Sequence, residues 1–136
     1  MKYPIEPMLA VGGVVREQGR VLLVKRANPP SQEQWSIPGG RVELGETLAQ
    51  AVERELLEET GLAVRCGDLI THLEVIDHDF VGRVRFHYLI LDFRAEWLSG
   101  SPRAGGDVLE VGWFSKQDLD QSEVSTTTRD LVLSTL

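Results

Sequence analysis

Residues 39–62 read GGRVELGETLAQAVERELLEETGL and contain the strongest local structural signals of the sequence. Helix-forming residues dominate from Thr47 onward, which predicts a helix over residues 47–60. Thr47 belongs to the residue types that cap helix N-termini, and Gly61 follows where a left-handed C-terminal residue is favoured. The stretch therefore specifies both ends of one helix.

An acidic cluster occupies the second half of this helix. At about 100° per residue, one face is apolar and is expected to meet the core: Leu48, Ala49, Val52 and Leu56. Glu55, Glu58 and Glu59 are mutual neighbours at the edge of that face, and the direction of Glu59 lies within it. Each like-charged pair costs about 0.2–0.5 kcal/mol, and the helix dipole disfavours anions there. The cluster opposes helix stability, so something must compensate for it.

From the residues alone, two interpretations of the cluster stay open. It is a solvated acidic face with Arg54 as a partial counter-charge, or it is a site for a hard cation such as Mg²⁺ or Mn²⁺. No His or Cys joins it at zinc spacing, so zinc is disfavoured. The preceding Gly39–Gly40 pair either forms a tight turn or lets a backbone carbonyl approach a cation.

The same residues follow a longer pattern. The pattern G-x5-E-x7-R-E-U-x-E-E-x-G-U, where U is a bulky aliphatic residue, is matched without a gap by Gly40, Glu46, Arg54, Glu55, Leu56, Glu58, Glu59, Gly61 and Leu62. With this composition a chance match is about one in a million. The pattern resembles the Nudix box, and residues 35–39, 83–93 and 110–114 also look like features of that family.

The resemblance implies a fold and an activity. It implies a single Nudix hydrolase domain over residues 1–136, an α/β/α sandwich with a mixed central sheet and the box helix at residues 47–60. The implied reaction is hydrolysis of the pyrophosphate bond in a nucleoside diphosphate linked to another moiety. The implied cofactor is Mg²⁺, for which Mn²⁺ can substitute.

The resemblance also implies roles by position. The implied metal ligands are Glu55, Glu58, Glu59 and the Gly39 carbonyl. Glu46 and Gly40 would support the metal shell, and Arg54 would orient a glutamate. Glu58, Glu55 and Arg54 are therefore expected to be catalytic. The acceptor of the water's proton is either a box glutamate or a later acid, Asp107 or Glu110. The alternatives are a strand-surface charge for Glu110 and a turn-forming role for Asp107.

Four residues outside the box are candidate substrate contacts. Trp35 could stack on a nucleobase or a ribose, or it could anchor the core. Arg26 and Arg41 could meet phosphates, with an ordinary surface position as the alternative for each. Asp107 is the fourth candidate.

The rest of the chain predicts strands and loops. Residues 8–16 and 20–26 are expected to form a hairpin. Further strands are expected over residues 63–76, 83–95 and 108–114, and the first of these three is expected to break near residues 66–68. Expected loops span 27–34 and 99–107, and a closing helix spans 127–136. Strands around one long helix predict a mixed α/β sandwich.

Charge and cysteine content restrict the partners. Fourteen Lys and Arg against 21 Asp and Glu give the 136 residues a net charge of −7. A negative surface repels phosphate backbones, so neither a nucleic-acid polymer nor a membrane is an expected partner. The lone Cys66 suits a reducing compartment, and we expect a cytoplasmic protein. Leu57 points away from the core, so a loop or a partner subunit is expected to cover it, as in a homodimer.

Three functions are compatible with these observations. The first is divalent-metal-dependent hydrolysis of an ADP-ribose-like or sugar-nucleotide substrate. The second is the same chemistry on a nucleoside triphosphate, as in nucleotide-pool cleaning. The third, of another class, is a non-catalytic nucleotide-sensing Nudix domain, which the complete set of box carboxylates disfavours.

Overall fold

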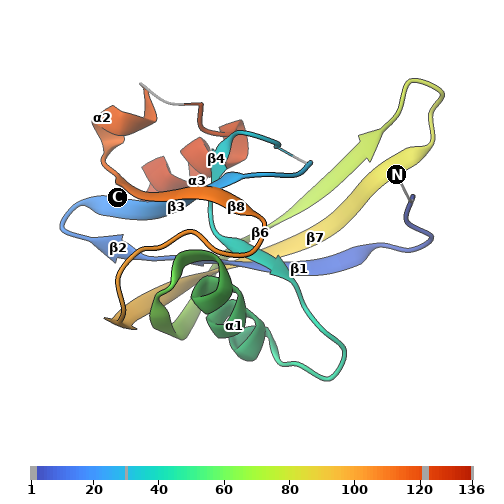
Figure 1. The fold of residues 1–136 in the computed structure, drawn as a ribbon. Helices are drawn as coiled ribbons and strands as arrows, with labels where there is room; N and C mark the ends of the chain where they lie inside the picture. The colour runs from blue at the N-terminus through green and yellow to red at the C-terminus, as the bar shows by residue number, and fades with distance from the viewer. Residues whose placement is uncertain (1–2, 30, 121–122, 136) are drawn as a thin grey trace.

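The computed structural model describes residues 3–29, 31–120 and 123–135. Along the chain these residues form β1 (Met8–Val14), β2 (Arg16–Glu17), β3 (Arg20–Arg26), β4 (Trp35–Ser36), β5 (Gly39–Arg41), α1 (Leu48–Thr60), β6 (Ala63–His78), β7 (Val84–Ser99), β8 (Val108–Phe114), α2 (Lys116–Leu119) and α3 (Thr126–Thr135) (Figure 1). The predicted strand at residues 108–114 and the predicted long helix are both present.

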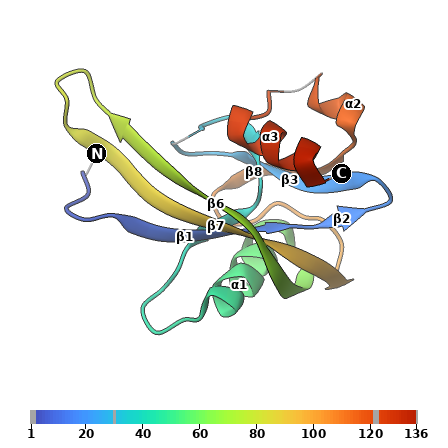
Figure 2. The same ribbon diagram turned by 180° about the vertical axis from the view of Figure 1, so that it is seen from behind.

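The strands form two sheets between helices. The first has the order β5-β1-β7-β6, with β1 parallel to β7 and the other pairs antiparallel. In the second sheet β3 pairs antiparallel with β2, β4 and β8. Helix α1 lies on one side of the strands, and α2 and α3 lie on the other (Figures 1 and 2). This arrangement confirms the α/β/α sandwich with a mixed sheet.

Two hydrophobic clusters hold these layers together. One joins α1 to the strands and includes Val52, Leu56 and Leu22, all fully buried. The other lies toward α2 and α3 and includes Leu23 and Val132. Because successive residues of β3 point to opposite faces, Leu22 serves the first cluster and Leu23 the second. The strand layer is therefore buried on both sides.

Helix α1 has the predicted ends. Thr47 Oγ1 accepts a hydrogen bond from the Gln50 amide at 3.1 Å, and Gln50 Oε1 accepts one from the Thr47 amide at 2.9 Å. Gly61 adopts φ 76°, the left-handed conformation that glycine tolerates. One expectation was wrong: Ala49 is exposed and Ala51 is buried, because the face that meets the strands is centred between Ala51 and Leu56.

The secondary structure differs from the prediction in three places. Residues 8–14 are not one arm of a hairpin, because β1 pairs with β5 and β7 and only β2 pairs with β3. The expected break near residues 66–68 is a register shift within the continuous strand β6. The short helix α2 was not predicted; its four residues are too few to show a periodic pattern.

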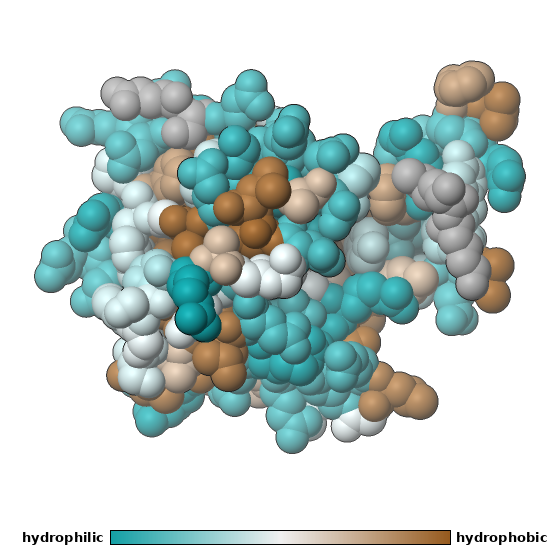
Figure 3. All heavy atoms as spheres, in the orientation of Figure 1, coloured by the Kyte–Doolittle hydropathy of each residue, from teal (hydrophilic) through white to brown (hydrophobic). Residues whose placement is uncertain are grey.

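The β6–β7 hairpin extends past the body of the molecule (Figures 1 and 2). Hydrophobic residues lie at its outer end (Figure 3), where Phe80 and Val81 are exposed. Elsewhere the visible face is largely hydrophilic over α1. Across the described part of the chain, no helix is both long enough and apolar enough to cross a bilayer.

Candidate active site

The Gly39–Gly40 pair is part of strand β5 and does not form a tight turn. Gly39 pairs with Gly12 and Gly40 with Val11 of β1. A Cβ at Gly39 would overlap the Val11 carbonyl, and one at Gly40 would come within 2.5 Å of the Glu55 carboxyl carbon. Glycine is required at position 39 because the β1 backbone lies against it, and a side chain at position 40 would displace the Glu55 carboxylate.

Arg54 is the centre of an ion-pair network. Its guanidinium donates to Glu46 through Nε at 2.7 Å and through Nη2 at 2.9 Å. Its Nη1 donates to Glu55 at 2.9 Å and to Glu58 at 3.3 Å, and its Nη2 donates to the Arg41 carbonyl at 3.0 Å. The hydrogen bonds from Arg54 to Glu46, with one from the backbone amide of Glu43, lower the pKa of Glu46 to about 2. One cation therefore orients three acidic side chains.

The three glutamates of α1 differ in their surroundings. Glu59 is buried and accepts a hydrogen bond from the Gly39 amide at 2.9 Å. Desolvation raises its pKa to about 7, against the lowering effect of that bond. Desolvation likewise raises the pKa of Glu55, although Arg54 counteracts it. Glu58 is exposed. The surface alternative therefore fits Glu58 alone, and the other two carboxyls lie where their negative charge is costly.

The donor set fits a hard divalent cation. Carboxylate oxygens and backbone carbonyls are the ligands that Mg²⁺ and Mn²⁺ take in proteins, and the Glu55 and Glu59 carboxyls need positive charge nearby. Among residues 3–29, 31–120 and 123–135, no three acidic, His or Cys side chains already form a ready metal cage. The present hydrogen bonds explain this, because Arg54 holds Glu55 and Glu58 while the Gly39 amide holds Glu59.

A pocket of about 570 Å³ opens beside this network. Its polar part is lined by side chains from α1, β3, β5 and the loop before β8, namely Glu55, Glu59, Arg26, Arg41 and Asp107. Its other walls are mainly apolar and come from β6, β7, β4–β5 and α3, through Leu73, Val75, Tyr88, Ile90, Ile37 and Leu131. A volume and composition of this kind suit a small organic molecule that carries negative charge at one end.

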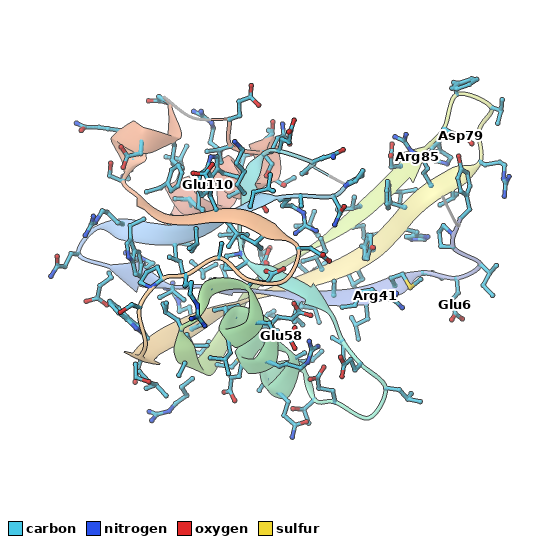
Figure 4. The ribbon with its side chains drawn as sticks, in the orientation of Figure 1. Glu6, Arg41, Glu58, Asp79, Arg85 and Glu110 are labelled. Atoms are coloured by element: carbon cyan, nitrogen blue, oxygen red, sulfur yellow. The ribbon has the colours of Figure 1, made fainter. Side chains whose placement is uncertain are left out.

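The structure separates the candidate residues into two groups. Arg26, Arg41 and Asp107 line the pocket. Trp35 does not line it; its ring packs on Phe114 with centroids 4.7 Å apart, which matches the core alternative. Glu110 also lies outside the pocket, on β8, where it pairs with Lys25 at 3.5 Å, and Figure 4 shows it well away from Glu58. Its position matches the strand-surface alternative.

The buried acid of the pocket was missed from the sequence. Asp92 of β7 is buried and lines the pocket. Residues 88–93 read YLILDF, so Asp92 is the lone charge in an apolar run, and that isolation is the signal that could have identified it.

Curated relatives resemble this chain over most of its length. An ADP-ribose pyrophosphatase of Methanocaldococcus jannaschii is 36% identical over 85% of this chain and 66% of its own length. An oxidized purine nucleoside triphosphate hydrolase of Danio rerio is 35% identical over 88% of this chain and 72% of its own length.

A solved structure and a family model agree with this likeness. The crystal structure of a MutT NUDIX hydrolase from Burkholderia pseudomallei superposes with a TM-score of 0.75 at 29% identity, covering 96% of this chain and 99% of that one. The family model described as NUDIX domain matches residues 6–133. The box glutamates lie against the glycine strand β5, on a fold shared with that hydrolase, and the family model matches nearly the whole chain. This chain therefore belongs to the Nudix hydrolase family.

Proposed function

We propose that this protein hydrolyses the pyrophosphate bond of a nucleoside diphosphate linked to another moiety, of the ADP-ribose or sugar-nucleotide type. The observation that carries the proposal is a single pocket with the Glu55 and Glu59 carboxyls and two arginines at one part and apolar walls elsewhere. Such a pocket can take a diphosphate and a base together. The name of the M. jannaschii relative, an ADP-ribose pyrophosphatase, supports this choice.

We further propose that Mg²⁺ is the cofactor, with Mn²⁺ as a substitute. Glu55, Glu58, Glu59 and the Gly39 carbonyl would hold it, and Glu46 with Gly40 would support that shell. When bound, a divalent cation supplies charge neutralisation at the diphosphate and a water of lowered pKa. A pyrophosphate is a poor electrophile surrounded by negative charge, so this chemistry is what the reaction lacks without a cation.

The chain's own residues then position the reactants. Arg54 fixes Glu55 and Glu58 through charge-assisted hydrogen bonds, and its attachment to Glu46 fixes Arg54 in turn. Arg26 and Arg41 line the pocket beside Glu55 and Glu59, where they can bind phosphate oxygens. The proton of the attacking water goes to a box glutamate or to Asp107. Asp107 lines the pocket and Glu110 does not, so Asp107 is the later acid that we retain.

A nucleoside triphosphate is the second candidate substrate. The observation in its favour is the D. rerio relative, which is named an oxidized purine nucleoside triphosphate hydrolase and is nearly as similar as the first. Both substrates place a phosphoanhydride beside the same carboxylates, so the box does not separate them.

A hydrolysis screen tests the proposal. The protein is incubated with Mg²⁺ at about 5 mM, which is ample for a carboxylate site. The substrates are ADP-ribose, UDP-sugars, and both oxidised and ordinary deoxynucleoside triphosphates. AMP and ribose phosphate as products support the first substrate class, and a nucleoside monophosphate with pyrophosphate supports the second. Equal rates with and without Mg²⁺ would contradict both.

We also propose a cytoplasmic homodimer. The single cysteine, Cys66, supports a reducing compartment, and the exposed Leu57 and Leu44 support a covering partner. Light scattering on a size-exclusion column tests the second copy, which predicts about twice the 15.2 kDa mass of one chain.

A further inference from the structure

The pocket contains a carboxylate that pyrophosphate chemistry does not use. Asp92 lies near the middle of β7 and is 4% exposed. Tyr88 and Ile90, four and two residues earlier on the same strand, line the pocket with it. Side chains two apart on a strand share a face, so all three belong to one wall of the pocket.

Asp92 has no polar partner in the part of the chain that the structure describes. Within the described residues no hydrogen bond or ion pair reaches its carboxylate. Desolvation alone raises its pKa, to about 6, with no neighbouring charge to offset it. A buried carboxylate without a donor is unfavourable, so a purely structural role does not explain it.

The surrounding backbone makes room for this carboxylate. Gly12 of β1 is the register partner of Asp92, and a Cβ added at Gly12 would overlap Asp92 Oδ1. The same added atom would lie 3.1 Å from Ile37 Cγ2, so the side chains of Asp92 and Ile37 both fill the space that the missing Cβ of Gly12 leaves. The carboxylate therefore lies against the Gly12 backbone, and the pocket that Asp92 lines is where a donor can reach it.

A second polar group in the pocket wall also lacks a partner. Ser36 lines the same pocket, and its hydroxyl oxygen is fully enclosed and has no hydrogen bond among the residues that the structure describes. That oxygen is enclosed by protein, so the unpaired group that a ligand in the pocket can reach is the Asp92 carboxylate.

We propose that Asp92 is a specificity-determining residue that accepts a hydrogen bond from an N–H group of the substrate's nucleobase. The walls beside it are Tyr88, Ile90 and the apolar side chains of β6, which suit a flat base better than a hydroxyl-rich sugar. A base with an amino or imino donor satisfies the carboxylate, and a base without one leaves it buried and unpaired. The inference rests on the proposed function and adds the part of the substrate that the pocket reads.

The test compares substrates that differ in one donor. ADP-ribose and its guanine counterpart are compared with the analogue whose base is unsubstituted purine, in the same Mg²⁺ buffer. For the parent protein, kcat/KM for the better of ADP-ribose and its guanine counterpart is expected to exceed kcat/KM for the purine analogue by about 10- to 100-fold. This is the range for a hydrogen bond to a charged group. Asp92→Leu, which has no acceptor, is expected to bring this ratio close to one, and Asp92→Asn to give an intermediate ratio.

Asp68→Asn is the matched control. Asp68 is an exposed carboxylate of β6 outside the pocket, so its loss should leave the ratio unchanged. An unchanged ratio in the Asp92 variants would overturn the inference. If the Asp92 variants instead removed discrimination between ribose and 2′-deoxyribose substrates, the donor would be a sugar hydroxyl and the base assignment would be wrong.

A binding measurement separates this inference from the proposed function. Calorimetry compares AMP, GMP and purine riboside monophosphate on the parent and on Asp92→Leu, with no turnover needed. Donor-dependent affinity in a protein that hydrolyses none of the substrates supports Asp92 and refutes the proposed reaction. The role of Asp92 is refuted if the protein hydrolyses its substrates but binds monophosphates with and without a base donor equally well. It is also refuted if the protein binds none of the monophosphates.

Discussion

Arg54 and Glu46 form a two-pronged ion pair that joins helix α1 to the loop before it. The guanidinium donates through Nε at 2.7 Å and through Nη2 at 2.9 Å to the two oxygens of one carboxylate. The remaining donors of Arg54 reach Glu55, Glu58 and the Arg41 carbonyl. Arg54 therefore cannot turn without releasing the box glutamates, and Glu46 acts on the site through it.

This pairing predicts a pH-dependent contribution from Glu46 to stability. The pKa of Glu46 is lowered in the folded protein from 4.5 to about 2, so its ionised form favours folding. That contribution is fully present above pH 4.5 and is lost as the pH falls toward 2. In urea unfolding, Glu46→Gln should lower the free energy of unfolding most at pH 6–7, and the difference from the parent should shrink on acidification.

Glu43→Gln serves as the comparison for this measurement. The Glu43 carboxylate lies 3.7 Å from the Arg54 guanidinium, a long contact, and its side chain is 69% exposed. Its removal should therefore have little effect at any pH. A difference between parent and Glu46→Gln that stays constant from pH 7 to pH 3 would show that the lost contribution is not the ionised carboxylate.

Glu58 is expected to be needed for turnover and not for folding. It is exposed, and its carboxylate accepts a hydrogen bond from Arg54 at 3.3 Å. Glu58→Gln should lower kcat by at least about 100-fold, since one cation ligand or proton acceptor is lost, while the melting temperature stays within a few degrees. Glu43→Gln again removes one exposed charge near Arg54 and should keep near-parental kcat. Normal activity in Glu58→Gln would contradict the assigned role.

Divalent cations should stabilise the protein. The carboxyls of Glu55 and Glu59 are desolvated and their pKa values are raised, so bound positive charge lowers the cost of ionising them. At about 100 times the Kd, binding adds about 2.7 kcal/mol, or several degrees in melting temperature. The Glu55→Gln/Glu59→Gln variant should lose most of this rise. KCl at equal ionic strength controls for screening, and an equal rise with K⁺ would argue against a specific site.

Asp92 predicts stability that falls as the pH rises. Its pKa is raised from 3.8 to about 6, so the protonated form favours folding below pH 3.8 and that advantage disappears as the pH rises to 6. Between pH 4 and pH 7 the parent should lose up to about 3 kcal/mol of unfolding free energy relative to Asp92→Asn, which has no charge to desolvate. Parallel pH profiles would show that Asp92 is not desolvated as described.

The sequence predicted helix α1 and its carboxylates well because local signals specify them. Thr47 and Gly61 cap the helix, and the spacing of Glu55, Glu58 and Glu59 fixes their face. The strand from Val108 to Phe114 was also delimited correctly. Each of these features depends on residues close together in the chain, which is where patterns of propensity and period are informative.

Features that depend on long-range pairing could not be predicted. Nothing local shows that β1 leaves β3 to pair in parallel with β7, because that choice is made by residues about 80 positions away. For the same reason the sequence left Trp35 open between core and substrate, and did not separate Asp107, in the pocket, from Glu110, outside it. The isolation of Asp92 in an apolar run marks it in the sequence, but its place in the pocket wall follows from the strand pairing.

The most direct measurement is an anomalous difference map from crystals grown with Mn²⁺ and a non-hydrolysable ADP-ribose analogue. The account predicts a manganese peak among the carboxylates of Glu55, Glu58 and Glu59, in contact with the analogue's diphosphate. Those three side chains extending into solvent, with no peak among them at saturating Mn²⁺, would contradict it.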